Sequence, residues 1–429
     1  MAPRSRIRDL GYAPGQEWLS PGSGNSITDV PGVQVGTYTR HEGVWDPEHP
    51  KAKLSRTGVT IICPRPQDTI WTHPVYASIG VLNGTGEMTN SHMIKETGYL
   101  YTPLALTDTM HVGAVHTGVL KHLYERAPKK DKEGRERAPF YLPCVAETSD
   151  CLSTPDTFHL EPENVLSAFD DIASSMERLN GAPRPAHEFE GVKGGGTGML
   201  CLGHKGGNGT SSRLLPIADG NNDAYTLGCF VQCNFGAARD LTIGGAKIGR
   251  KLCQSGFHGK EKQDAENALV HEDDGIGNEG SILVVLATDA PLLPYQLDRL
   301  LRRIPIGLSR VGCASHQYSG DIGLAFSTQT TIPPPKSSEA AGLEQVGKTT
   351  ATTRKHGPLN LPKVSTHAVQ TVDDASMNLL FYAAADVVEE AVLNALCTGT
   401  DQEGVDGFKV KGLDHDIVAK LLKEEGVSK

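Results

Sequence analysis

Short apolar runs separated by glycine-bearing turns recur along most of this chain. The clearest run, at 282–287, follows a glycine and a serine and contains no polar residue. A run of this length bounded by turn residues predicts a strand buried on both faces. Further strands are predicted in the last part of 27–36 (entered through a turn) and at 58–64, 77–89 (running into a glycine-rich turn), 143–148, 225–236 and 319–328.

A second pattern repeats with the period of an α-helix. Apolar residues recur at helical spacing along 162–179, 296–304 and 378–396. A helix start signal at 107–109 precedes an apolar stretch that runs to residue 120. Strands and helices do not alternate strictly along the chain, so a layered α/β or α+β sandwich is favoured over a barrel.

Composition narrows the function without identifying it. The 429 residues are 38% hydrophobic and 21% charged, with a formal net charge of −10, which is typical of a soluble globular protein. No basic patch is present, so nucleic acid is not expected as a partner, and no apolar run is long enough to span a membrane. The 9 cysteines do not complete a zinc site and predict thiols in a reducing compartment. Because residues 1–8 lack an apolar signal segment, a cytoplasmic location is expected.

One segment imitates a nucleotide-binding motif. Residues 342–349 match the P-loop pattern letter for letter, but that motif works only between a strand and a helix. Prolines precede the segment at 333–335, and threonines and a Gly-Pro pair follow it, so nucleotide binding is not predicted. The surrounding stretch at 332–365 is rich in Pro, Ser, Thr and Lys, and we expect a flexible insertion there.

The serine that opens the clearest strand is the strongest candidate for chemistry. Ser281 follows Gly280, and the predicted strand would hold its hydroxyl on a rigid element. The sequence offers no paired base, because neither a Gly-x-Ser-x-Gly elbow nor a His-Glu-x-x-His zinc motif accompanies it. An N-terminal α-amine, with a pKa of about 7.7–8.0, would serve as the base if the Gly280–Ser281 bond were cut. The ordinary alternative is a turn that leads into a strand.

Motifs of several residues each follow one another along the chain. They are Arg-Asp-Leu-Gly at 8–11, Asn-Ser-Ile-Thr-Asp-Val-Pro-Gly at 25–32, Asn-Gly-Thr-Gly-Glu-Met-Thr at 83–89, Gly-Gly-Gly-Thr-Gly-Met at 194–199, Val-Gln-Cys-Asn-Phe-Gly at 231–236, Gly-Ser at 280–281 and Ser-Gly-Asp-Ile at 319–322. In this order they resemble the self-cleaving aminopeptidases of the L-aminopeptidase D-Ala-esterase/amidase type, peptidase family S58, to which the β-peptidyl aminopeptidases also belong. The resemblance spans nearly the whole chain.

The resemblance implies a fold, a processing step and an assembly. The fold would be a four-layer α/β/β/α sandwich that resembles N-terminal nucleophile hydrolases but has different connectivity. Residues 1–429 would form a single catalytic domain that cuts itself into an α chain, 1–280, and a β chain, 281–429. Related members assemble as homotetramers, so a tetramer of α/β heterodimers is expected. No metal and no organic cofactor are implied.

The resemblance also implies residue roles in an aminopeptidase or amidase that releases N-terminal residues from peptides, amides or esters. Ser281 would form an acyl-enzyme, with its own α-amine as general base. Asn234 would help to form the oxyanion hole, and Ser319 and Asp321 would support the nucleophile. Glu147 would lie near the free amine of a small peptide or aminoacyl amide as its counter-charge. Taken singly, Asn234 is also readable as a strand-end cap, Asp321 as a turn residue and Glu147 as a surface carboxylate.

Three features depart from the family pattern. After Thr148 the family suggests an aromatic residue and then Asp-Gly, whereas this chain has Ser-Asp-Cys at 149–151, which changes a wall or donor of the expected pocket. Glu279 stands where a small residue is usual, and the insertion at 332–365 is long.

Two other functions therefore stay open. One is an acyltransferase of the ornithine acetyltransferase type, whose threonine nucleophile argues against it here, and the other is an uncleaved, non-catalytic homologue.

Overall fold

The computed structural model describes residues 4–49, 52–67, 69–70, 73–126, 140–155, 158–218, 223–257, 280–329 and 368–427. The insertion predicted at 332–365 and the P-loop-like letters at 342–349 lie outside these residues, as does Glu279. Among the described residues, no helix combines the length and the apolar character that crossing a membrane would require.

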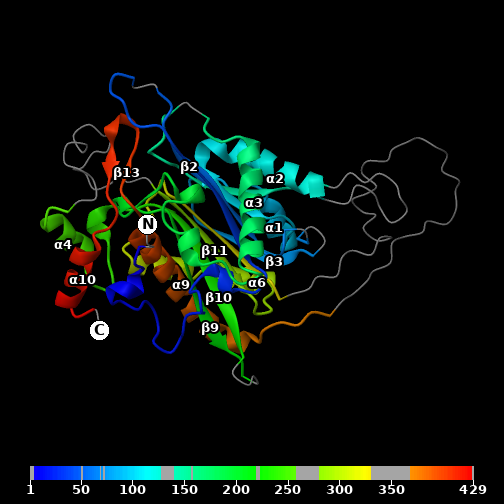
Figure 1. Cartoon of the computed structure of the whole chain (residues 1–429). Helices are drawn as coiled ribbons and strands as arrows, with labels where there is room; N and C mark the ends of the chain where they lie inside the picture. The colour runs from blue at the N-terminus through cyan, green and yellow to red at the C-terminus, as the bar shows by residue number, and fades with distance from the viewer. Residues whose placement is uncertain are drawn as a thin grey trace, which may run out of the picture.

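Two sheets form the centre of the molecule (Figure 1). The smaller has the strand order β1-β2-β5-β6, and the larger has the order β4-β3-β12-β11-β10-β9. Within the larger sheet β11 runs parallel to β12 and antiparallel to β10. The bounds are β1 Gln34–Glu42, β2 Ser55–Cys63, β3 Val75–Gly84, β4 Tyr99–Leu100, β5 Leu104–Asp108, β6 Cys144–Thr148, β9 Asn208–Pro216, β10 Ala224–Asn234, β11 Ser281–Thr288 and β12 Gly320–Ser327.

Helices cover the outer face of each sheet (Figure 1). On the smaller sheet, α2 and α3 pack against apolar residues of β2 and β5. On the larger sheet, α6, α7 and α9 share a core with β10 and β11. The bounds are α1 Ser91–Thr97, α2 Val112–Arg126, α3 Pro162–Arg178, α4 Ile248–Gln254, α6 Pro294–Leu301, α7 Ile304–Arg310, α9 Met377–Thr398 and α10 His415–Glu424, with short strands β7 Leu200–Cys201, β8 His204–Lys205, β13 Gln402–Glu403 and β14 Lys409–Val410.

The central strand β11 is buried on both faces, as the apolar run predicts. Ile282, Val284 and Leu286 point into the core that contains α9. Leu283 and Val285 point into the core between the two sheets. Successive side chains of a strand alternate between its faces, so an unbroken apolar run requires a covered sheet on each side. The four-layer α/β/β/α sandwich is therefore confirmed.

Local residues set the boundaries of two predicted segments, and one of the predicted boundaries was wrong. In the segment 27–36, a short 3₁₀ helix at 27–29, capped by the Ser26 side chain, precedes the strand, which starts at Gln34 in the last part of the segment, as predicted. The helix predicted at 296–304 ends at Leu301, and a separate helix begins at Ile304. Pro305 lies in the first turn of that second helix, where its missing N–H removes no intrahelical bond.

Candidate active site

Ser281 lies at the meeting point of three strands of the larger sheet. It opens β11, is 9% exposed, and faces Asn234 of β10 on one side and Gly320 of β12 on the other. Its Oγ accepts a hydrogen bond from the Gly320 amide at 3.1 Å. The first residue of a fully paired strand has little freedom, so the hydroxyl is held in a defined position.

The same amide also contacts the carbonyl that precedes the serine. The Gly320 N–H donates to the Gly280 oxygen at 3.2 Å, so the hydroxyl and the carbonyl oxygen lie beside one shared donor. Gly280 has no room for a side chain, because a Cβ there would lie 2.5 Å from both the Asn234 carbonyl oxygen and the Phe235 Cα. The backbone at this bond is therefore packed as tightly as only glycine allows.

The Asn234 carboxamide has a defined orientation at the end of β10. Its Oδ1 accepts from the Leu200 amide at 3.0 Å, and its Nδ2 donates to the Ser149 carbonyl at 2.6 Å. A flipped amide would set oxygen against oxygen and N–H against N–H. Since an amide nitrogen carries two hydrogens, one remains available for another acceptor after the bond to Ser149.

Ser319 and Asp321 flank Gly320 on β12 and its entry. The Ser319 hydroxyl donates to Asp321 Oδ1 at 2.6 Å, and Asn83 Nδ2 donates to Asp321 Oδ2 at 3.2 Å. Burial raises the pKa of Asp321 above its ordinary value, while hydrogen bonds from Ser319, Ser315 and Asn83 oppose that rise. The result is a carboxylate that is more basic than a surface aspartate and is connected to a neighbouring hydroxyl.

Glu147 is a buried carboxylate near the end of β6, in the other sheet. It is 6% exposed and accepts hydrogen bonds from the Glu87 amide at 2.8 Å and from the Thr109 hydroxyl. The turn at Gly86 lies between this carboxylate and β12, the strand that pairs with the serine's strand, because a Cβ at Gly86 would lie 3.4 Å from both Glu147 Oε1 and Gly320 Cα. Two bonds leave a carboxylate with capacity for a further donor.

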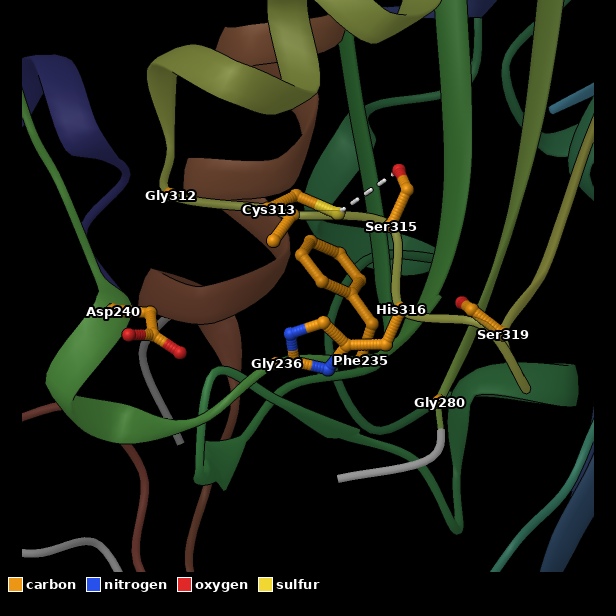
Figure 2. A pocket seen from close by; sticks show the side chains of 10 residues that line it. Phe235, Gly236, Asp240, Gly280, Gly312, Cys313, Ser315, His316 and Ser319 are labelled. Carbon is orange, nitrogen blue, oxygen red and sulfur yellow. Dashed lines mark hydrogen bonds between the residues drawn. The ribbon is translucent and has the colours of Figure 1, made fainter. Parts of the chain in front are cut away.

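A small hollow opens beside Gly280 (Figure 2). Figure 2 shows the His316 and Phe235 rings next to one another in its lining, with Ser319 and Gly280 to one side. Its wall is mixed, since it includes an aromatic ring, an imidazole, a thiol and a carboxylate. The lining residues are Phe235, Gly236, Asp240, Gly280, Gly312, Cys313, Ala314, Ser315, His316 and Ser319.

The structure brings Ser281, Asn234, Ser319 and Asp321 together on three adjacent strands, with Glu147 linked through Gly86. Sequence reasoning did not single out the Gly320 amide or the Asn83 side chain. Both belong to motifs already noted, at 319–322 and 83–89, but the sequence does not show that the Gly320 amide contacts Ser281 or that the Asn83 side chain contacts Asp321. In the part of the chain that the structure describes, no group of three or more His, Cys, Asp or Glu is arranged to hold a metal ion.

The fold and this site define a class of enzyme, a hydrolase with a serine at the start of a buried central strand. The model of peptidase family S58 matches residues 25–410. The chain belongs to peptidase family S58, and it is a serine-type aminopeptidase. The family resemblance predicted from the ordered motifs is thereby confirmed.

Relatives match over nearly all of this chain and over more than nine-tenths of their own length. Beta-peptidyl aminopeptidase BapA of Sphingosinicella microcystinivorans is 35% identical over 420 residues, which cover 98% of this chain and 92% of that protein. The L-aminopeptidase D-Ala-esterase/amidase of Ochrobactrum anthropi, whose structure is described as a new variant among the Ntn hydrolase fold, matches with a TM-score of 0.77 and 32% identity over 100% of each chain. A Burkholderia sp. beta-aminopeptidase matches with a TM-score of 0.75 and 34% identity, covering 98% of this chain and 99% of that one.

Proposed function

We propose that the chain is made as one precursor, cuts itself between Gly280 and Ser281, and then uses the exposed Ser281 as an N-terminal nucleophile. The observation that carries this proposal is the single Gly320 amide that contacts both the Ser281 hydroxyl and the Gly280 carbonyl oxygen. A hydrogen bond to that oxygen withdraws electrons from the carbonyl carbon and stabilises negative charge as it develops. The nucleophile and its target are adjacent before any reaction begins.

Asp321 is the base that we assign to the cleavage step. In the uncut chain Ser281 has no α-amine, so its proton must pass to another group. Asp321 is joined to Ser319 by a 2.6 Å bond on the neighbouring strand, and burial raises its pKa. The hydroxyl attacks the Gly280 carbonyl carbon, the C–N bond to residue 281 breaks, and Asp321 returns the proton to that nitrogen, which becomes the α-amine. Water then hydrolyses the resulting ester and releases the Gly280 carboxylate.

After cleavage the α-amine of Ser281 takes over as the base. It removes the proton from the hydroxyl as this attacks the carbonyl of an N-terminal residue, and it returns that proton to the leaving amine. The free hydrogen of Asn234 Nδ2 stabilises the oxyanion, and water hydrolyses the acyl-enzyme. Ser319 and Asp321 keep their supporting role at the nucleophile.

Glu147 pairs with the free amine of the substrate and so restricts cleavage to the first residue. Its burial and its remaining acceptor capacity support this role. The substrates would be small peptides, aminoacyl amides or esters. The related proteins are named for β-peptidyl aminopeptidase and for L-aminopeptidase D-Ala-esterase/amidase activity, so both α- and β-aminoacyl compounds are the substrates to test.

The processed protein would be one catalytic domain that assembles as a homotetramer of α/β heterodimers in the cytoplasm. The assembly follows from the family resemblance, and native mass measurement tests it. The location is supported by the cysteines, since none of the 9, all of which lie in the described residues, is paired in a disulfide, as in a reducing compartment.

The central test compares the wild type with Ser281→Ala. Purified wild type is expected to yield two fragments, 1–280 and 281–429, on denaturing electrophoresis and by intact mass, whereas Ser281→Ala stays a single chain of 45.8 kDa and releases no N-terminal residue. Ser309→Ala serves as the control, because that hydroxyl bonds only the Ile306 carbonyl on the surface of α7. A Ser281→Ala protein that still splits between 280 and 281 would contradict the proposal.

A further inference from the structure

A buried lysine lies next to the site without a role in the chemistry described so far. Lys205 of β8 pairs with Leu200 of β7, and the short hairpin lies beside the end of β10 through a bridge between Cys201 and Phe235. The Lys205 side chain is fully buried. Removing an ammonium group from water without a paired anion is strongly unfavourable. Burial lowers the pKa of Lys205 to about 7, while Cys151, Cys201 and Asp150 oppose that fall.

Backbone carbonyls receive the ammonium group instead. Lys205 Nζ donates to the carbonyl oxygens of Met199 at 2.6 Å, Gly206 at 2.8 Å and Gly196 at 3.4 Å. An ammonium group has three hydrogens, so these contacts use all of them. The bond to Met199 has the short length expected when the donor carries a charge.

The shortest of these contacts leads directly to Asn234. The Met199 carbonyl and the Leu200 N–H belong to one planar peptide group, and that N–H donates to Asn234 Oδ1 at 3.0 Å. Hydrogen bonds in series polarise one another. In its protonated form, Lys205 places a positive charge at the carbonyl end of this peptide and therefore makes the N–H end a stronger donor to Asn234.

We propose that Lys205 is a positioning residue, which orients and polarises the Asn234 carboxamide through the Met199–Leu200 peptide. The inference rests on the proposed oxyanion role of Asn234. Electron density drawn toward Oδ1 leaves the Nδ2 hydrogen more positive, and so a better donor to the charge that develops in the transition state. Without the ammonium group, the peptide that holds Oδ1 loses the bond that fixes its own position.

A double-mutant cycle separates this role from a purely structural one. The variants are Lys205→Met, Asn234→Ala and the double variant, assayed on the α- or β-aminoacyl p-nitroanilide that the wild type hydrolyses fastest. Rates are normalised to the amount of the 281–429 fragment. Lys205→Met is expected to lower kcat by about tenfold or more, since loss of a whole oxyanion donor costs about 10²–10³-fold, and to change KM by less than about twofold. In the Asn234→Ala background the same change is expected to lower kcat by less than about threefold.

Lys193→Met is the matched control. Lys193 precedes the same glycine loop and donates to the His187 carbonyl at 3.1 Å, but it makes no bond to the Met199–Leu200 peptide. Its kcat is expected to equal that of the wild type. If Lys205→Met does not accumulate as folded protein, Lys205→Gln replaces it, because glutamine keeps a donor without the charge. The same comparison then decides the question: kcat should fall when Asn234 is present and should change little in the Asn234→Ala background.

Three outcomes would overturn the inference. A Lys205→Met enzyme with the kcat of the wild type means that the charge does not act on the site. A loss that is as large in the Asn234→Ala background means that Lys205 acts elsewhere. If Asn234→Ala itself keeps full activity while the wild type is active, the oxyanion role of Asn234 is wrong and the role of Lys205 falls with it.

Discussion

The position before the nucleophile has no room for a side chain. Gly280 packs against the backbone of Asn234 and Phe235, where any Cβ would overlap. The Gly320 position is as confined, since a Cβ there would lie 2.2 Å from the Thr85 carbonyl oxygen. The donor and the acceptor of the hydrogen bond from the Gly320 amide to the Gly280 carbonyl are therefore both glycines, and the backbone of each lies very close to adjacent segments of the same protein.

Gly280→Ala is expected to slow self-cleavage. The new methyl group displaces residue 280 from β10 and moves its carbonyl away from the Gly320 amide and the Ser281 hydroxyl. Misplacement of a reacting group by about 1 Å can cost about 10²-fold in rate, so we expect cleavage about 10- to 100-fold slower. The fraction of cut chain is followed over time by electrophoresis. Gly113→Ala is the control, because a Cβ at that helical position meets nothing within 4 Å, and equal rates for the two variants would contradict the argument.

At the scale of elements, the contact between α2 and α3 contains a buried histidine. The His122 ring stacks on Phe169 with centroids 3.4 Å apart, and among the described residues neither ring nitrogen has a hydrogen-bond partner. Burial, with a smaller contribution from Arg126, lowers the pKa of His122 to about 3. The folded state therefore keeps this ring neutral at pH values where the unfolded chain protonates it.

His122 is expected to make the fold sensitive to acid. Because its folded pKa lies below its unfolded value of about 6.5, its contribution to stability is intact above pH 6.5 and is lost as the pH falls toward 3. At pH 5 the loss is about 2 kcal/mol. His122→Phe keeps a ring on Phe169 and removes the titrating group. The free energy of unfolding in urea is measured for the wild type and the variant at pH 7 and at pH 5. On going from pH 7 to pH 5, the stability of the variant relative to the wild type should rise by about 2 kcal/mol. An unchanged difference would refute the role of His122 in acid sensitivity.

The sequence pattern predicts apolar buried strands such as β11 but not buried strands made of small polar residues such as β9. β11 is evident because its residues are apolar on both faces. β9 is buried as well, but its letters at 208–212 are Asn-Gly-Thr-Ser-Ser, which do not indicate a strand. These residues are small because α9 packs directly on the strand: a Cβ at Gly209 would lie 2.0 Å from the Ala391 carbonyl oxygen, and Ser211 donates to the Val387 carbonyl.

The same distinction applies to the candidate site. Ser281, Asn234 and Asp321 were identifiable because they stand in motifs with a fixed order. Lys205 was not identifiable, because its side chain contacts backbone carbonyls. Every residue has a backbone carbonyl, so the sequence does not show which of them a side chain contacts. The orientation of Asn234 likewise depends on the Leu200 amide and the Ser149 carbonyl, which the fold brings together from distant segments.

For the whole molecule, the proposed cut would not separate the two chains. The strands β11 and β12 follow residue 280 but lie in the larger sheet between β3 and β10, which precede it. The α and β chains would therefore share one sheet and its hydrogen bonds. A buried ion cluster adds a second connection, because Arg8 and Arg213 of the first part both contact Glu390 of α9 in the second, at 2.5 and 2.7 Å.

Glu390→Gln is expected to weaken this connection strongly. The side chains of Arg213 and Glu390 are both fully buried, and although burial alone would raise the pKa of Glu390, the Arg8 bond and the Arg213 charge hold it below its ordinary value. Removing the negative charge leaves arginines facing each other without an anion, which costs about 3–5 kcal/mol. Urea unfolding of the cut protein, at one fixed concentration because two chains separate, measures the loss. Glu424→Gln, from the exposed pair of Lys420 and Glu424, is expected to change stability by less than about 1 kcal/mol; similar small losses in both variants would show that the shared sheet alone holds the chains together.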